Sequence, residues 1–356
     1  MDSNAKAKKF IKLLAICTVC TLFATAFIVM LFDPFYHYHA PLPSMKAVLE
    51  ERDYEVIGTI DHFNYDSVLL GDSLVENTNT AILTEYFDVT AIKAIRAGGS
   101  NADILFYLDR AYEKHELKKV FYCIDKAALV SDTKVTFPEN DYYYLVDKNP
   151  LNDWKYLWNK DVLLKKIPLQ LAYNTVLDYN ENEAYAWYST KTFSKEAMLT
   201  HYEPETDFND PQPVPDTFYE NLSLLKAEIE SHPETEFYLF YPPVSMLWWD
   251  SELRAGNLDA DLEILKELSA AFVDCPNVRL YGFYNADEYT QLDKYMDVVH
   301  FSPEVNHAMY EDMKDSLYLM NADTVDEDLE QLREKVLAFS SEEITEYYPD
   351  TLAYTP

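Results

Sequence analysis

Three short segments carry the residue types that nucleophilic catalysis requires. Residues 71–74 read GDSL and follow an apolar run, residues 98–101 read GGSN, and Asp297 and His300 stand three apart just before a proline. In a serine hydrolase, a carboxylate orients an imidazole, the imidazole takes the serine proton, and backbone N–H groups stabilise the oxyanion. The spacing therefore predicts Ser73 as nucleophile, His300 as base and Asp297 as the carboxylate that orients it.

Each segment also has an ordinary structural interpretation. Asp and Ser are favoured N-cap residues, so Ser73 fits the start of a helix as well as a catalytic role. A tight turn would explain one of the two adjacent glycines, Gly98 and Gly99. His307, in the predicted helix that follows, is a second candidate for the base. The combination favours chemistry, because three of the chain's six glycines, Gly71, Gly98 and Gly99, fall at strand ends that we expect to be neighbours.

The elements that must position these residues alternate between strands and helices. Apolar runs and helical spacing predict strands at 67–71, 89–97, 118–125, 235–245 and 277–284, and helices at 74–87, 101–115, 218–232, 258–273, 303–320 and 326–339. This alternation is typical of an α/β fold with a parallel sheet, in which reactive groups collect beyond the carboxyl ends of the strands. Residues 126–215 lack the rhythm and are predicted to be an insertion that caps the sheet.

The N-terminus holds the longest apolar segment. Residues 10–32 carry one charge, Lys12, and three more lysines precede them. That length spans a bilayer core of ~30 Å, and the lysines place the N-terminus in the cytoplasm. The alternative is a cleaved signal peptide, since residues 24–26 read ATA. We expect a single-pass protein of the cell membrane, divided into a cytoplasmic N-terminus 1–9, an anchor 10–32, a membrane-proximal linker 33–60, an extracellular domain 61–340 and an acidic tail 341–356.

Composition limits the partners and cofactors. The formal net charge of −33 excludes nucleic acid as a partner, because phosphate backbones require basic patches. Two of the four cysteines lie within the apolar segment, and Cys123 and Cys275 are either free thiols or a disulfide. His37 and His39 form a pair with no third ligand nearby. We therefore expect no metal, and the proposed chemistry needs no organic cofactor.

Taken in order, the catalytic segments resemble the SGNH/GDSL hydrolase family. Residues 71–74 match its first block literally, Gly98 matches the glycine of its second block, and Asp297 and His300 match its closing Asp-x-x-His. The resemblance covers about residues 65–125 and 235–320. It implies a flavodoxin-like three-layer α/β/α sandwich, a Ser73–His300–Asp297 triad, and an oxyanion hole that includes the N–H groups of Ser73 and Gly98.

One block of that family is altered. Its third block supplies an asparagine whose amide donates to the oxyanion, but this chain has Asp125 at the corresponding strand end. An ionised carboxylate cannot donate a hydrogen bond. Either the hole has two donors, or Asn101 or Lys126 supplies the third. The remaining candidates for the substrate pocket are Asp72, Gly99, Asp125, Ser245 and Trp248.

With its N-terminal anchor, the chain resembles in particular the cell-envelope acyl-transfer proteins of this family. Examples are the teichoic-acid D-alanylation protein DltD and the polysaccharide O-acetyltransferases AlgX and AlgJ. It implies a serine that passes an acyl group to a cell-surface polysaccharide or teichoic acid, with a multi-pass membrane O-acyltransferase as partner. A simple carbohydrate deacetylase and a catalytically silent scaffold for such a partner are the alternatives. The aromatic residues within 240–250 either stack on sugar rings or pack in the core.

Overall fold

The computed structural model describes residues 3–355 and contains a five-stranded parallel sheet. The strands are β1 (Ser67–Gly71), β2 (Ala91–Ile95), β3 (Lys119–Cys123), β4 (Glu236–Tyr241) and β5 (Val278–Gly282), in the order β2-β1-β3-β4-β5. This is the flavodoxin-like order. The predicted α/β fold is confirmed, and the strand at 67–71 has the predicted bounds. All five of its residues are buried, which explains why an unbroken apolar run predicted it.

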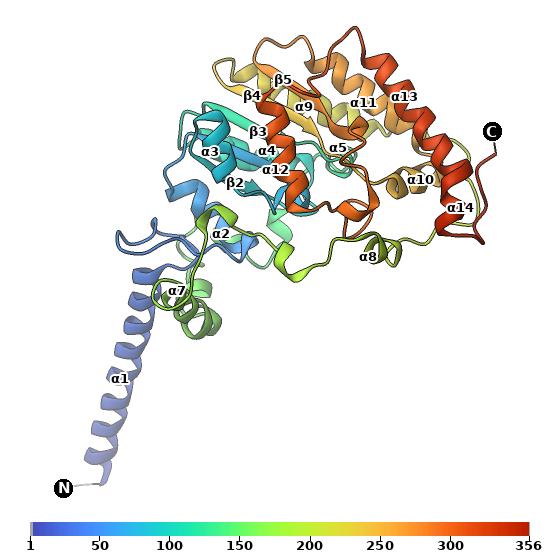
Figure 1. Cartoon of the computed structure of the whole chain (residues 1–356). Helices are drawn as coiled ribbons and strands as arrows, with labels where there is room; N and C mark the ends of the chain where they lie inside the picture. The colour runs from blue at the N-terminus through green and yellow to red at the C-terminus, as the bar shows by residue number, and fades with distance from the viewer. Residues whose placement is uncertain (1–2, 356) are drawn as a thin grey trace. The chain divides into compact units, whose positions relative to one another are not determined.

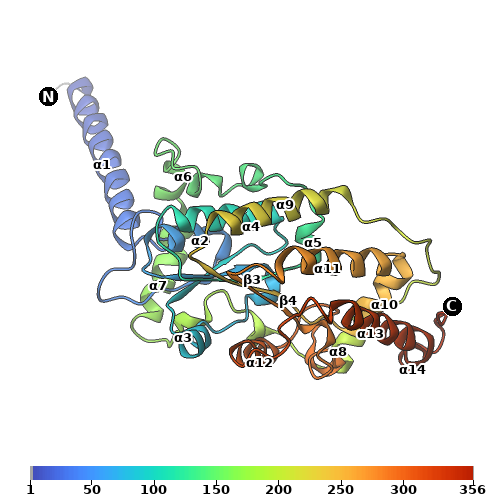
Figure 2. The same ribbon diagram turned by 90° about the horizontal axis from the view of Figure 1, so that it is seen from above.

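Helices cover both faces of the sheet (Figure 2). One face carries α4 (Asn101–Tyr112), α9 (Asp216–Ser231) and α11 (Leu258–Phe272), and the other carries α3 (Ala81–Phe87) and α12 (Pro303–Lys314). An apolar core cluster lies under α3 and α12, where Phe121 and Phe240 of the sheet are fully buried. The core therefore holds the strand ends in a fixed register.

The chain forms two compact units. The first comprises residues 1–63 and 137–181, and the second comprises residues 64–136 and 182–356. The second unit contains the whole sheet and every segment singled out for catalysis. Residues 137–181 of the expected insertion belong to the first unit, whereas residues 182–215 belong to the second.

The first unit is helical. Its longest helix is α1 (Ser3–Phe32), which is long and apolar enough to cross a membrane (Figure 1). The remaining elements are α2 (Arg52–His62), the 3₁₀ turns η2 (Phe137–Glu139) and η3 (Tyr143–Leu145), α6 (Trp154–Leu157), the π-helical turn η4 (Val162–Lys166) and α7 (Ile167–Tyr173). Helix α2 begins within the stretch expected to be a linker, 33–60, and extends two residues beyond it.

The other helices of the second unit are shorter or C-terminal. They are α5 (Lys126–Leu129), α8 (Lys195–Leu199), α10 (Met246–Ala255), α13 (Val325–Ala338), the π-helical turn η9 (Phe339–Glu343) and α14 (Ile344–Tyr347). Short 3₁₀ turns are η1 (Ser73–Val75), η6 (Tyr188–Thr190), η7 (Phe283–Asn285) and η8 (Leu292–Lys294).

The helix predicted at 74–87 is wrong as a single element. The chain forms η1, then a polar stretch, and only then α3. Asn79 interrupts the helix, because its side-chain oxygen accepts a hydrogen bond from the N–H of Ala81 and so starts a new element. The interruption places Asn77 and Glu76 where they bind a distant segment, as described below.

Candidate active site

Ser73 stands at the carboxyl end of β1, in a turn that only glycine can begin. Gly71 has a φ of +147°, and a Cβ on it would lie 2.8 Å from Cγ2 of Val75. Asp72 then caps the turn, and its Oδ1 accepts a hydrogen bond of 2.9 Å from the N–H of Leu74. Ser73 is the first residue of η1. The N-cap is therefore Asp72 and not Ser73, so the interpretation of Ser73 as a cap is wrong and its hydroxyl is left for another role.

The structure brings Ser73, His300 and Asp297 together in hydrogen-bonding sequence. Oγ of Ser73 lies 2.8 Å from Nε2 of His300, and Nδ1 of His300 lies 2.8 Å from Oδ2 of Asp297. The N–H groups of His300 and Val299 also donate to Oδ1 of Asp297, which fixes the loop that carries the base. This is the geometry in which a carboxylate orients an imidazole toward a nucleophile.

Asp297 is ionised in this arrangement. Burial opposes its charge, but the hydrogen bonds from the ring and backbone of His300 outweigh burial and lower the pKa of Asp297. An ionised carboxylate at Nδ1 leaves the proton there and presents Nε2 as an acceptor to the serine hydroxyl. The three side chains thus form the continuous hydrogen-bonded chain that proton transfer from a serine would require.

The oxyanion side of the site includes Gly98, which follows β2, the neighbour of β1. Its φ is +59°, and a Cβ built on it would have no other atom within 4 Å. Gly98 lines the same cavity as Ser73 and His300, with a volume of about 450 Å³. Backbone at this position approaches the cavity without a side chain in the way, as an oxyanion-binding N–H requires.

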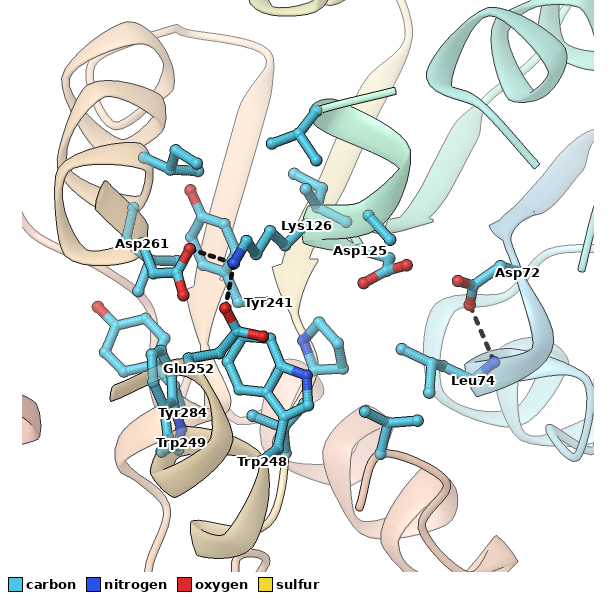
Figure 3. Close-up of a pocket in the computed structure, with 18 of the residues that line it drawn as sticks. Asp72, Leu74, Asp125, Lys126, Tyr241, Trp248, Trp249, Glu252, Asp261 and Tyr284 are labelled. Atoms are coloured by element: carbon cyan, nitrogen blue, oxygen red, sulfur yellow. Dashed lines mark hydrogen bonds and ion pairs between the residues drawn. The ribbon is translucent and has the colours of Figure 1, made fainter. Parts of the chain in front are cut away.

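Asp125 follows β3, the neighbour of β1 on its other side, and also lines the cavity. Gly98, Ser73 and Asp125 thus follow the carboxyl ends of three adjacent strands, β2, β1 and β3. Figure 3 shows the Asp125 carboxyl group on the same side of the cavity as that of Asp72. Burial first, and then the charge and hydrogen bond of Asp125, raise the pKa of Asp72 well above its usual range. Asp72 therefore keeps its proton to a higher pH than an ordinary aspartate does.

A second charged group lies across the cavity. Nζ of Lys126 lies 2.7 Å from Glu252 and 2.5 Å from Asp261, and it stands 5.4 Å from the ring centroid of Trp248 (Figure 3). Burial is the main cause that raises the pKa of Asp261 to about 7; Lys126 opposes the rise and Glu252 adds to it. Lys126 thus pairs with two carboxylates and is not positioned to donate a hydrogen bond to an oxyanion.

Trp187 is a residue near the base that sequence reasoning missed. Its ring packs edge-to-face on His300, with 5.4 Å between centroids and an interplanar angle of 86°. Its Nε1 donates to Oε2 of Glu76 at 2.9 Å, and its backbone N–H donates to Oδ1 of Asn77 at 3.0 Å. A tryptophan in a stretch without periodicity gives no sequence signal for this contact. It forms the wall against which the His300 ring is held.

A buried lysine ties the Trp187 segment to the nucleophile turn. Nζ of Lys93, in β2, donates to the backbone carbonyls of Glu76 at 2.5 Å and Ala184 at 2.6 Å. Burial lowers the pKa of Lys93 to about 7 from its usual 10.5. The two carbonyls belong to segments more than a hundred residues apart, so Lys93 crosslinks them non-covalently.

Other candidates lie outside the cavity. The side-chain amide of Asn101 donates to Asn221, and its carbonyl accepts a hydrogen bond of 2.9 Å from Tyr122. Asn101 therefore gives no donor to the oxyanion. The N–H of Gly99 donates to the carbonyl of Arg96, as in a turn. Ser245 caps α10 and donates to the carbonyl of Val298.

The last two candidates, His307 and Trp248, differ in whether they line the cavity. His307 lies 3.1 Å from the hydroxyl of Tyr86 and does not contact the cavity, so it is displaced as a base by His300. Trp248 lines the cavity, as expected of a pocket residue. Within residues 3–355, no group of three or more His, Cys, Asp or Glu side chains is arranged to hold a metal ion. Cys123 and Cys275 are free thiols.

No family model matches the chain, and no curated protein matches it. Several solved structures align with it, among them the following two. One, from Streptococcus pneumonia and provisionally named a platelet activating factor, has 16% sequence identity and a TM-score of 0.40; the match covers 75% of this chain and 92% of that one. The other, from Bacteroides fragilis and provisionally named an acylhydrolase, has 10% identity and a TM-score of 0.35; the match covers 76% of this chain and 90% of that one.

Proposed function

We propose that the protein is a membrane-anchored serine esterase or O-acyltransferase of the SGNH type, acting outside the cell on a surface glycan or teichoic acid. The observation that carries this proposal is the 2.8 Å contact between Oγ of Ser73 and Nε2 of His300, with Asp297 on the far nitrogen. Hydrolysis and transfer share the first half of the reaction, and only the acceptor in the second half differs.

In the first half, Oγ of Ser73 attacks the carbonyl carbon of the ester while Nε2 of His300 takes its proton. The negative charge that develops on the carbonyl oxygen falls between the N–H groups of Ser73 and Gly98. His300 then gives its proton to the leaving alcohol, and an acyl group remains on Ser73. In the second half, water or a glycan hydroxyl loses its proton to His300 and attacks the carbonyl carbon of the acyl-serine; the bond from that carbon to Oγ breaks, and His300 returns the proton to Oγ.

The cavity supports an acyl or sugar ligand of moderate size. Its volume of about 450 Å³ lies within the range of small-molecule sites. Trp248, Trp249, Tyr241 and Tyr284 contribute aromatic surface to its wall, and such rings pack on the apolar faces of sugars. The acidic residues Glu252 and Asp261 lie at the same wall and accept hydrogen bonds from hydroxyl or ammonium groups.

A fluorophosphonate probe tests the proposal directly, because it labels only an activated serine. The full chain in detergent should be labelled, and Ser73→Ala and His300→Ala should both abolish labelling. Ser223→Ala, on the exposed face of α9, is the matched control and should label like the wild type. A folded wild type that resists the probe would contradict the proposal.

A catalytically silent scaffold is the second candidate, and Asp125 is the observation that favours it. A carboxylate beside the oxyanion position opposes the charge that catalysis must stabilise. The scaffold role predicts that Ser73→Ala retains full biological activity and still copurifies with a multi-pass membrane partner. Product analysis with and without a glycan acceptor separates transfer from simple deacetylation.

A further inference from the structure

Residues 151–177 of the first unit expose a cluster of large apolar side chains. Its most exposed members, here called the interfacial patch, are Leu151, Trp154, Trp158, Leu164, Val176 and Leu177. Leu151 and Val176 are 85% and 79% exposed. So many exposed large apolar side chains within one short segment suggest a site of interaction with protein or membrane.

The patch is continuous with the anchor helix. Helix α6 and turn η4, which carry part of the patch, pack against α1, as Figure 1 shows beside the last turns of that helix. Nε1 of Trp158 donates a hydrogen bond of 2.9 Å to the backbone carbonyl of Leu22. Val29, on the same face two turns later, is fully buried. The contact therefore runs along the C-terminal part of the apolar segment itself.

The position of Leu22 sets the depth of this contact. Lys9 and Lys12 mark the inner end of the apolar segment, and Phe32 marks its outer end. Leu22 precedes Phe32 by ten residues, which at 1.5 Å per residue places it ~15 Å below the outer end. The hydrocarbon core is ~30 Å thick, so Leu22 lies near its middle when α1 spans the bilayer. A side chain bonded to Leu22 must then lie within the outer leaflet.

The composition of the segment suits that position. Tryptophan is enriched at membrane interfaces, and an indole N–H within lipid needs an internal acceptor, which Leu22 provides for Trp158. Residues 151–177 contain four lysines and two aspartates, a local net charge of +2 in a chain of −33. Lys165 and Lys166 pair with Asp161 and Glu51, whereas Lys155 and Lys160 are exposed and can extend their ammonium groups toward anionic headgroups.

We propose that the interfacial patch is embedded in the outer leaflet beside α1, so that the chain binds the bilayer through a monotopic surface as well as through its spanning helix. The partner is lipid, and the contact is largely apolar with a basic rim. The proposal rests on the membrane anchoring that forms part of the proposed function. Two contacts with the membrane fix the tilt and rotation of the first unit, which a single helix would leave free.

Depth-dependent fluorescence quenching tests the proposal in the full chain. Leu164→Cys and Val176→Cys, in a background without native cysteines, are labelled with an environment-sensitive dye and reconstituted in vesicles that contain spin-labelled lipid. Both labels should show blue-shifted emission, loss of intensity with lipid-borne spin label, and protection from aqueous iodide. Val19→Cys in α1 is the positive control, and Leu224→Cys on α9, which is 42% exposed, is the aqueous control.

The controls separate the ways in which the proposal can fail. If Val19→Cys is quenched by lipid while Leu164→Cys is quenched by iodide, the anchor stands and the patch is not embedded. If Leu164→Cys is protected from both quenchers, protein covers the patch, and lipid is the wrong partner. If Val19→Cys itself is not quenched by lipid, α1 does not span the bilayer, and the anchoring and the patch are overturned together.

Discussion

Replacing Asp125 with asparagine should accelerate ester hydrolysis, although the substitution falls beside the nucleophile. Asp125 follows β3 and lines the cavity together with Ser73 and Gly98, which follow the two adjacent strands. An ionised carboxylate there offers no hydrogen to an oxyanion and repels its charge. Asparagine has nearly the same shape and offers an N–H donor instead.

The size of the gain follows from the value of one oxyanion donor. Such a donor contributes ~3 kcal/mol, or about 10²-fold in kcat. This is an upper limit, because the amide of Asn at position 125 can also donate to Asp72, whose carboxyl group now interacts with Asp125. The gain should grow with pH. Burial, and then the charge of Asp125, raise the pKa of Asp72, so Asp72 gains its negative charge at a higher pH than an ordinary aspartate does.

The assay is kcat for a chromogenic acetyl ester, measured across the neutral and alkaline range for three proteins. The advantage of Asp125→Asn over the wild type should increase as pH rises, because Asp72 then gains a charge beside the oxyanion position. Asp72→Asn is the matched control, because its amide can donate to Asp125 as the protonated carboxyl group does, and it should keep the neutral wild-type rate. A folded Asp125→Asn enzyme that is slower than the wild type at every pH would refute the reasoning.

Three further substitutions test how the site is held. Gly71→Ala should lower the melting temperature and abolish probe labelling, because φ is +147° and a Cβ would lie 2.8 Å from Val75; such strain costs about 1–3 kcal/mol. Trp187→Ala should lower kcat by ~10-fold, because the His300 ring loses the side chain against which it packs. Trp187→Phe keeps a ring and should lower kcat less. An unchanged kcat in Trp187→Ala would contradict this role of Trp187. Lys93→Met should remove a pH dependence of stability. Burial lowers the pKa of Lys93 to about 7, so the unfolded chain binds more protons up to pH 10.5, and wild-type stability rises through this range by up to about 1.4 kcal/mol per pH unit. If the free energy of unfolding changed with pH equally in the wild type and in Lys93→Met, the predicted role of Lys93 would be refuted.

The strands and the triad could be predicted because each depends on local chemistry. The run at 67–71 is apolar on both faces, which only a buried strand satisfies over so short a length. Asp297 and His300 are three residues apart on a loop, close enough for the carboxylate to reach both the backbone and the ring. The sheet topology then explains how Ser73, at the end of β1, comes to lie beside His300.

The contacts that could not be predicted join distant segments. Nothing in the sequence around Trp187 indicates that it packs on His300, because the contact depends on how the chain returns after residue 181. Lys93 lies in a strand pattern that suggests a solvated side chain, yet it is 3% exposed and bonded to two carbonyls. The predicted helix at 74–87 failed for the same reason, since Asn77 binds the Trp187 segment instead of continuing a helix.

The shortness of η1 changes how the oxyanion must be stabilised. A long helix after Ser73 would have placed a positive dipole end at the site, but η1 contains three residues and offers only local N–H groups. Gly98 adds one donor, Lys126 is held by Glu252 and Asp261, and Asp125 adds negative charge. In the proposed mechanism, His300 is therefore already positioned as the base, whereas the oxyanion hole is weak. Such a site favours acyl donors that carry good leaving groups, because these need less stabilisation of the oxyanion. That preference is consistent with an enzyme that receives activated acyl groups rather than one that hydrolyses stable esters.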